Sequence, residues 1–276
     1  MDPRDTENTS FITRNRTYCF QAMPFGLCNA PATFQHLMNV FLSGLNQDVL
    51  LVYLDDIIIH SGDLPSHPKS IERFLERMRL ANLKLKVSKC RMPQREVHIL
   101  GHVVSDNGLK MDPAKIEGVA TWPDSQNLKE VRSFVGLCAW YREFVPDFAT
   151  LTAPLHSLTR KGQRFLWSTE CNRSFLELRD RLFSAPVLAL PIDDGRFILD
   201  VDASDLSVVA DLSQRQGGKE RVIAYFSKRH AATEMNYCTT HKELLAVVKA
   251  LRKFRVYLLG RCSSCALTTA LFVGSV

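Results

Sequence analysis

Two adjacent aspartates, Asp55 and Asp56, are the residues of this 276-residue sequence best placed to do chemistry. They stand between two apolar, β-branched runs, Val49–Leu54 and Ile57–Ile59. This pattern predicts a buried β-hairpin with both carboxylates at its tip. Two carboxylates about 4 Å apart repel each other by about 1 kcal/mol in water, and carboxylate oxygens are the ligands that Mg²⁺ prefers. A metal site is therefore one interpretation, and an ordinary Asp-Asp turn is the other.

Basic residues gather downstream of this pair. Between positions 69 and 91 the chain has eight lysines and arginines and only two acids, Glu72 and Glu76. The basic residues are at positions 69, 73, 77, 79, 84, 86, 89 and 91. The whole chain carries a formal charge of +6, which is compatible with a polyanionic partner. The 69–91 stripe could contact phosphates, and its alternative is a solvated helix face.

The remaining composition excludes several classes of protein. The chain is 46% hydrophobic and 23% charged, which is ordinary for a globular protein of roughly two domains. It has no apolar run of the ~18 residues that a membrane helix needs, and its polar N-terminus does not resemble a secretion signal. We therefore expect an intracellular protein, cytoplasmic or nuclear, that contacts no membrane. Of eight cysteines only Cys262 and Cys265 form a CxxC, with no second pair to complete a zinc site, so we expect reduced core thiols.

Periodicity predicts the elements that position the aspartates and the basic stripe. Apolar residues at helical spacing predict helices from Asn29–Pro31 to Leu45 and over Ile71–Met78. Alternation predicts a strand over 83–87, an apolar run predicts another over 97–104, and Asp106–Gly108 predicts a turn. The stretch 110–160 is mostly helical, with Asn127 and Glu130 as a capping box.

A separate α+β unit is expected after Trp167. A helix through Leu182 precedes strands at 196–202, about 207–213 and 221–227, and a helix then runs from Thr240 to Phe254. We expect the apolar residues of this last helix to face inward. They are Leu244, Leu245, Val247, Val248 and Leu251.

The order of several longer motifs is informative. Met23–Gln35 (MPFGLCNAPATFQ) precedes Tyr53–Asp56 (YLDD), which precedes Leu83–Cys90 (LKLKVSKC) and Leu100–His102. Further motifs are Phe134–Leu137 with Tyr141–Arg142, Asp202–Asp205, Glu220–Tyr225 and Asn236–Val248 (NYCTTHKELLAVV). Over roughly residues 10–260 this order resembles the reverse transcriptase/RNase H region of the Pol polyprotein of gypsy-type LTR retrotransposons.

The resemblance implies an α+β fold made of a partial polymerase palm, a thumb-like helical connection and a truncated RNase H-like domain. It places the palm at 1–105, the thumb-like and connecting region at 106–165, and the RNase H-like domain at 166–276 with an unmatched tail at 261–276. It implies RNA-directed DNA polymerase (nucleotidyltransferase) and ribonuclease H (endonuclease) activities. RNA template, DNA primer, RNA–DNA hybrid and deoxynucleotides would be the partners, Mg²⁺ the cofactor, and no small-molecule cofactor is implied.

The resemblance also implies roles for individual residues. Asp55 and Asp56 would hold metal at the polymerase centre, and Asp202 and Glu243 would do so at the RNase H centre. The substrate-binding residues would be Pro24, Phe25 and Gly26 in the nucleotide pocket, Gln35 near the template, Lys89 near the pyrophosphate, and Leu100, Gly101 and His102 in a primer-supporting hairpin. Glu243 has a second interpretation, because Thr240–Glu243 is itself a capping-box pattern.

Three departures from the family pattern stand out. No apolar strand ending in aspartate precedes Met23, and no Asp or Glu follows Glu243, so the family's further polymerase aspartate and two RNase H carboxylates have no counterpart. The segment Ser207–Asp211 replaces a glycine-containing apolar strand, and an unpaired Asp211 there would cost several kcal/mol. We expect weak or absent Mg²⁺ binding and no catalysis by this chain alone.

Two alternatives stay open. The first is a non-catalytic nucleic-acid-binding remnant that uses the 69–91 stripe. The second is a phospho-acceptor or metal-switch domain built on the Asp55–Asp56 turn, which predicts a parallel sheet with alternating helices.

Overall fold

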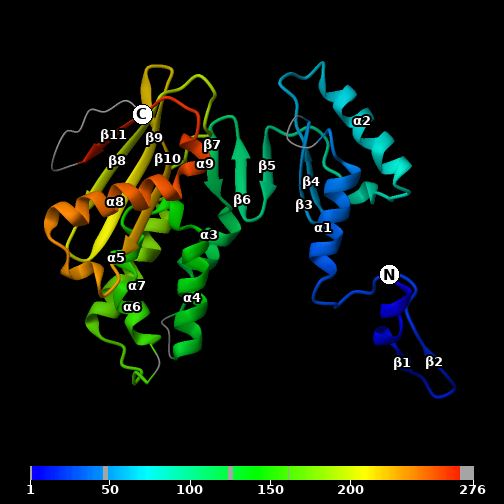
Figure 1. Ribbon diagram of the computed structural model, residues 1–276, viewed down its shortest axis with the longest axis horizontal. Helices are drawn as coiled ribbons and strands as arrows, with labels where there is room; N and C mark the ends of the chain where they lie inside the picture. Colours follow the sequence, from blue (N-terminus) through cyan, green and yellow to red (C-terminus); the bar gives the residue numbers. More distant parts are fainter. Residues whose placement is uncertain (1, 46–48, 124–126, 161, 268–276) are drawn as a thin grey trace. The chain divides into compact units, whose positions relative to one another are not determined.

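The computed structural model describes residues 2–45, 49–123, 127–160 and 162–267 (Figure 1). The chain divides into two compact units, Met1–Pro93 and Gln94–Val276. Within the described part of the chain, every helix is too short or too polar to span a bilayer.

The first unit is built around one helix, one hairpin and a second helix. Helix α1 (Ala30–Phe41) begins with Pro31 in its first turn, as the Asn29–Pro31 pattern predicts, and it ends four residues before Leu45, the expected end. Strands β3 (Leu50–Tyr53) and β4 (Asp56–Ile59) pair antiparallel and are followed by α2 (His67–Leu80). Shorter elements are η1 (Pro3–Asp5), η2 (Glu7–Thr9), β1 (Phe11–Ile12), β2 (Thr17–Tyr18) and η3 (Val87–Lys89).

A small core joins these elements. Its buried side chains come from α1, the segment after it, β3 and α2, and they are Met38, Leu42, Leu45, Leu50, Phe74 and Met78. The strand expected over 83–87 is wrong: residues 83–86 form no regular element, and η3 follows. Of residues 83–87, only Leu83 packs against the core. Alternation of apolar and charged residues is not enough for a strand when no neighbouring strand pairs with it.

The second unit opens with a three-stranded meander. Strands β5 (Glu96–Ile99), β6 (His102–Ser105) and β7 (Gly108–Met111) pair antiparallel in sequence order. The single strand expected over 97–104 is therefore wrong, because Leu100 and Gly101 form a tight turn between two strands. Gly108 has φ +129, and a Cβ there would lie 2.1 Å from the carbonyl oxygen of Leu188, so only glycine lets the two backbones approach.

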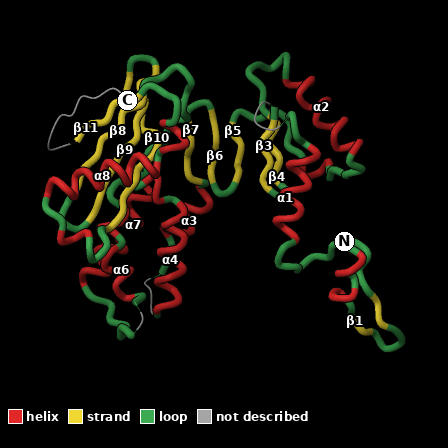
Figure 2. The backbone as a smooth tube through the Cα atoms, viewed as in Figure 1, coloured by secondary structure: helices red, strands yellow, loops and turns green. Residues whose placement is uncertain are grey.

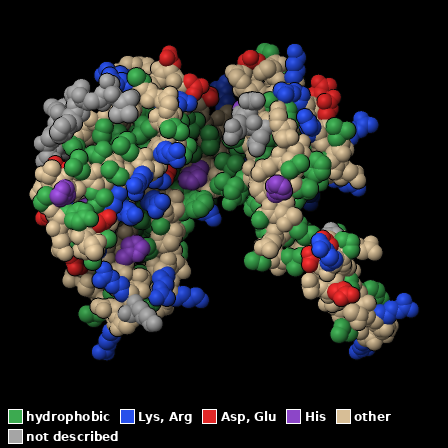
Figure 3. Space-filling model, in the orientation of Figure 1, with side chains coloured by type: hydrophobic (Ala, Val, Ile, Leu, Met, Phe, Trp, Pro, Cys, Tyr) green, Lys and Arg blue, Asp and Glu red, His purple; other side chains and the backbone are tan. Residues whose placement is uncertain are grey.

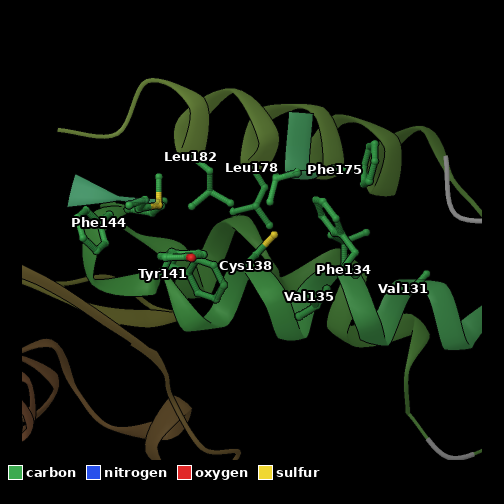
Figure 4. Packing of buried hydrophobic residues seen from close by; sticks show 14 of the residues in the cluster. Val131, Phe134, Val135, Cys138, Tyr141, Phe144, Phe175, Leu178 and Leu182 are labelled. Atoms are coloured by element: carbon green, nitrogen blue, oxygen red, sulfur yellow. The ribbon is translucent and has the colours of Figure 1, made fainter. Parts of the chain in front are cut away.

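A helical core fills the middle of this unit. Its helices are α3 (Pro113–Ala120), α4 (Leu128–Trp140), α5 (Phe148–Leu151), α6 (Ala153–Leu158) and α7 (Thr169–Phe183), with η4 (Arg142–Phe144) after α4. Asn127 caps α4 by accepting from the backbone N–H groups of Lys129 and Glu130, as its capping pattern predicts. Figure 4 shows how the apolar side of α4, from Val131 to Tyr141, packs against Phe175, Leu178 and Leu182 of α7.

A four-stranded sheet with the order β10-β9-β8-β11 forms the rest of the unit (Figure 2). Strands β8 (Phe197–Ala203), β9 (Ser207–Gln216) and β10 (Lys219–Arg229) are antiparallel neighbours. Helix α8 (Thr239–Lys253) packs on the face that carries Phe197, Leu199 and Val201, and α9 (Arg255–Leu258) follows it; η5 (Glu234–Asn236) precedes both. The expected helix and three strands are confirmed.

The buried side of α8 differs from the expectation. Leu244, Val248 and Leu251 are 56%, 42% and 41% exposed, whereas Ala246 and Ala250 are fully buried. The sheet already supplies large side chains such as Phe197 and Leu199, so the helix contacts it through small residues that let the backbone approach. The expectation is therefore wrong for Leu244, Val248 and Leu251, and it is confirmed for Val247, which is partly buried against the core.

Two further observations concern the tail of the second unit and the cysteines expected in the core. Residues 263–267 of the 261–276 tail form β11 (Ser263–Leu267), which pairs parallel with β8; 268–276 lie outside the described residues. Backbone pairing at a sheet edge depends little on side-chain type, which is why an unfamiliar sequence can occupy it. All eight cysteines are free, but only Cys138 and Cys171 are buried, and the others lie in loops, at helix or strand ends, or on the edge strand.

Candidate functional site

Asp55 and Asp56 lie at the tip of the β3–β4 hairpin, as the sequence predicts. Tyr53 pairs with Asp56 across the strands, so Leu54 and Asp55 make the turn. Leu54 has φ 50, a left-handed conformation that is uncommon for a residue with a side chain. Both aspartates are exposed, and their oxygens are free to take a hard cation from solvent.

Gln35 of α1 holds this tip in place. Its side-chain oxygen accepts a hydrogen bond from the backbone N–H of Leu54, and its Nε2 donates to the carbonyl of Val52 at 3.4 Å. The same Nε2 donates to Asn39 at 3.0 Å, which fixes the orientation of the amide. Sequence reasoning placed Gln35 near a template and missed this contact. The signal was its position one helical turn from buried Met38, on the side of α1 that meets β3.

The other candidate residues of the first unit lie on its surface. The side chain of Phe25 is fully exposed, and Gly26 has φ +92 in the turn before α1. Pro24 is half-buried, and Lys89 is exposed at the end of η3. All eight cations of the 69–91 stripe are exposed as well, so they can reach a ligand.

The predicted Leu100–His102 hairpin exists in the second unit. Leu100 (φ 50) and Gly101 (φ 78) form the two-residue turn between β5 and β6. Two consecutive aromatic residues at the end of α4 bind its carbonyls: Trp140 Nε1 donates to Leu100 at 3.2 Å, and the Tyr141 hydroxyl donates to Gly101 at 2.8 Å.

His102 lies among the aromatic rings beside this turn. Its ring stacks on Phe144 at 5.7 Å between centroids and meets Tyr141 edge-on at 5.3 Å. Burial lowers the pKa of His102, and the nearby Glu143 carboxylate opposes that effect. The ring is therefore neutral at pH 7, and its buried Nδ1 has no hydrogen-bond partner within the described part of the chain.

Asp202 and Glu243 are on neighbouring elements of the second unit. Asp202 is exposed near the end of β8, where its carboxylate accepts from the backbone N–H of Ala203 at 2.9 Å. Glu243 is half-buried in the first turns of α8. The capping box expected at Thr240 is wrong, because α8 begins at Thr239 with Cys238 at the cap position. Thr240 is already inside the helix, where its side chain no longer faces unpaired N–H groups.

The turn that follows Asp202 is anchored twice. Lys242 Nζ, buried on α8, donates to Asp205 at 2.7 Å, and this hydrogen bond lowers the pKa of Asp205. The buried His230 places its Nε2 3.1 Å from the carbonyl of Ser204. These contacts fix the end of β8, and sequence reasoning identified neither Lys242 nor His230.

A second carboxylate pair lies on the face of the sheet opposite α8. Asp200 and Asp211 are direct cross-strand partners, and Tyr225 of β10 pairs with Asp211. Burial raises the pKa of Asp211 to about 6, and the neighbouring Asp200 adds to the effect. The Oδ1 atom of Asp211 is buried without a partner among the described residues. The carboxylate without a partner that was expected at Asp211 is therefore present, and its side chain lies on the face opposite α8.

No three His, Cys, Asp or Glu side chains of residues 2–45, 49–123, 127–160 and 162–267 come together as a possible metal site. The carboxylates at Asp55–Asp56 suit Mg²⁺ by type and exposure, but they are two in number. The parallel sheet required by a phospho-acceptor domain is contradicted, because β3 and β4 pair antiparallel.

Two family models match the chain. The model for reverse transcriptase (RNA-dependent DNA polymerase) matches residues 1–104, and the model for the RNase H-like domain found in reverse transcriptase matches residues 167–264.

Curated relatives match over most of the chain. A retrovirus-related Pol polyprotein from transposon 297 of Drosophila melanogaster is 39% identical over 95% of this chain and 24% of its own length. The corresponding polyprotein from transposon opus of the same organism is 36% identical over 94% of this chain and 27% of its own length. The Tf2-3 polyprotein of Schizosaccharomyces pombe is 32% identical, over 92% and 19%. The chain therefore spans about a quarter or less of these relatives.

Solved structures agree with this fold. A foamy viral protease–reverse transcriptase in complex with double-stranded DNA superposes with a TM-score of 0.84 at 25% identity, over 96% of this chain and 46% of that one. The same kind of protein in complex with an RNA/DNA hybrid superposes with a TM-score of 0.81 at 25% identity, over 96% of this chain and 36% of that one. The two domain matches, the relatives and the shared α+β fold together show that the chain belongs to the reverse transcriptase/RNase H family of retrotransposon Pol polyproteins.

Proposed function

We propose that this chain is a reverse transcriptase/RNase H segment that holds primer, template and RNA–DNA hybrid but catalyses neither DNA synthesis nor hybrid cleavage by itself. The observation that carries the proposal is the exposed Asp55–Asp56 tip, fixed by Gln35, with only two carboxylates. We assign 1–105 to the palm, 106–165 to the thumb-like connection, and 166–276 to the RNase H-like domain.

Asp55 and Asp56 are the residues that would hold Mg²⁺ in the palm. When bound, divalent metal activates an attacking oxygen and neutralises charge on a leaving phosphate, and RT and RNase H families generally use such ions. Gln35 acts on the protein side by fixing the hairpin from which both carboxylates project. We assign nucleotide, template and pyrophosphate contacts to Pro24, Phe25, Gly26, Gln35 and Lys89, and primer contacts to Leu100, Gly101 and His102.

Asp202 and Glu243 are the corresponding residues of the RNase H-like domain. The contacts of Lys242 and His230 with the 204–205 turn keep the end of β8 in one position. No Asp or Glu follows Glu243 in the sequence, so two carboxylates again stand where the family site uses four. A site with half of its ligands cannot position substrate and metal together, which supports the expected lack of activity.

A primer-extension assay on an RNA template, with Mg²⁺ or Mn²⁺, tests the palm. We expect no incorporation by the full chain. Template-dependent incorporation that Asp55→Asn abolishes would show that the palm is active. Cleavage of the RNA strand of a hybrid, lost in Asp202→Asn, would show the same for the RNase H-like domain. In both assays Asp63→Asn, an exposed aspartate outside the proposed sites, is the matched control.

Nucleic acid binding without catalysis is the part of the proposal that can be measured directly. Two of the solved structures that superpose on this chain are complexes with double-stranded DNA and with an RNA/DNA hybrid. In this chain the eight exposed cations of the 69–91 stripe suit phosphate contacts. We expect the full chain to bind an RNA–DNA hybrid with an affinity that falls steeply as salt rises. Absence of binding at low salt would refute this function.

A further inference from the structure

We propose that Trp140, Arg142, Arg252, Lys253 and Arg255 form a second nucleic-acid-binding surface, which takes the sugar–phosphate backbone of a duplex. We call these five residues the α4–α8 surface. It belongs to the unit Gln94–Val276 and is separate from the 69–91 stripe of the other unit. The inference rests on the proposed function only in that the chain must bind nucleic acid.

A hydrogen bond and a shared cavity bring the two parts of this surface together from distant positions in the sequence. Lys253 at the end of α8 donates to Glu143, which follows α4, at 2.6 Å. Arg142 and Lys253 also line one small cavity, together with residues of β10. The ends of α4 and α8 therefore lie side by side, although they are more than a hundred residues apart in the chain.

The α4–α8 surface is strongly positive because three of its four cations, all but Lys253, form no ion pair among the described residues. Helices α8 and α9 carry five cations and a single acid, Glu243. Three of those cations are engaged: Lys242 with Asp205, Lys249 with Glu234, and Lys253 with Glu143.

Within the part of the chain that the structure describes, Arg142, Arg252 and Arg255 are exposed and form no ion pair. Figure 3 shows Lys and Arg atoms gathered over the C-terminal part of α8.

The kind of side chain favours nucleic acid as the partner. A guanidinium donates paired N–H groups in a plane that matches a phosphate, so three free arginines suit a phosphodiester backbone. Trp140 is 57% exposed, and its ring is held by the hydrogen bond to the Leu100 carbonyl. A fixed, exposed indole two residues before Arg142 is suited to stacking on a base or sugar. Because the indole is held at the turn, it is poorly suited to inserting into a lipid surface.

A matched pair of triple variants of the full chain tests the proposal. The first is Arg142→Gln/Arg252→Gln/Arg255→Gln. The control is Arg160→Gln/Arg164→Gln/Arg173→Gln, which removes the same charge from three exposed arginines of the α6–α7 segment. Binding of a labelled RNA–DNA hybrid is measured by fluorescence anisotropy over a series of salt concentrations, and circular dichroism checks that each variant is folded.

We expect the first triple variant to bind the hybrid at least about 10-fold more weakly than the control. Its plot of log K against log salt should be shallower by about 2 to 3, since each lost phosphate contact removes about 0.9 from the slope. Hybrid binding should also quench the tryptophan fluorescence of the native chain, and Trp140→Phe should remove that quenching.

Each other outcome has a definite meaning. Equal affinities and slopes for the two triple variants overturn the α4–α8 surface, while the proposed function survives if the native chain binds. No binding by the native chain at low salt overturns the proposed function, and this inference with it. Tighter binding of the native chain to anionic phosphatidylserine vesicles than to the hybrid, lost in the first variant only, assigns the surface to a membrane and refutes the proposal.

Discussion

Asp211→Asn should stabilise the unit Gln94–Val276 at neutral pH and have little effect in acid. Asp211 lies directly opposite Asp200 on adjacent strands, and burial raises its pKa to about 6. Its Oδ1 atom is buried without a hydrogen-bond partner among the described residues. The substitution keeps the shape of the side chain and removes the charge, and the new amide can donate to the Asp200 carboxylate.

The magnitude follows from the two pKa values. A folded-state pKa of about 6 against an ordinary value of 3.8 corresponds to at most about 3 kcal/mol, at about 1.4 kcal/mol per pKa unit, and solvent screening of this partly exposed carboxylate reduces the effect to about 1–2 kcal/mol. Because the folded state binds this proton more tightly than the unfolded state, the stabilising contribution is fully present below pH 3.8 and is lost as pH rises through about 6. The native chain should therefore lose about 1–2 kcal/mol of stability between pH 4 and pH 7 that the variant retains.

Urea unfolding followed by tryptophan fluorescence is the assay. All three tryptophans, Trp122, Trp140 and Trp167, lie in the same unit as Asp211, so their signal reports that unit. Asp194→Asn removes an exposed charge just before β8 and serves as the control, with an expected change within about 0.5 kcal/mol at every pH. An Asp211→Asn variant whose stability relative to the native chain is the same at pH 4.5 and pH 7.5 would refute the reasoning.

Three further predictions concern local contacts. Gln35→Ala removes the acceptor of the Leu54 N–H and should cost about 1–2 kcal/mol, seen as faster hydrogen exchange of that amide; unchanged exchange would contradict a clamp on the hairpin. Tyr141→Phe deletes the hydrogen bond to Gly101 and should cost about 1 kcal/mol in the same tryptophan-monitored unfolding, whereas an unaltered midpoint would show that the bond contributes nothing. Cys138 is fully buried with its pKa raised to about 12 by burial, so it should react with a thiol reagent only when the unit unfolds, long after exposed Cys19; equal rates would contradict the described core.

Helices and hairpins with strong local signals could be predicted from the sequence. The start of α1 at Pro31, the start of α4 at Asn127 and the turn before β7 could be predicted from local sequence. Proline in a first turn, a capping side chain and a tight turn each depend on neighbouring residues and not on distant ones. The strand expected over 83–87 failed for the opposite reason. Alternating residues become a strand only when another strand accepts their hydrogen bonds, and that partner must come from elsewhere in the fold.

The candidate site shows the same division. The order of motifs was enough to indicate the family, and the comparisons confirm it. The Asp55–Asp56 tip was also predicted, since two apolar runs around two acids fix a hairpin locally. The contact of Gln35 with that tip, and those of Lys242 and His230 with the turn after β8, join residues at least seventeen positions apart.

The amino-acid sequence by itself therefore determined the family, the element types with local signals and the position of the aspartate pair. Only the tertiary structure decided which face of α8 is buried, where small Ala246 and Ala250 contact the sheet and the larger Leu244 stays outside. It also decided that Asp211 faces Asp200, because strand register sets that pair. The physical reason is common to both: packing and register are properties of pairs of elements, and a single stretch of sequence specifies only one member of each pair.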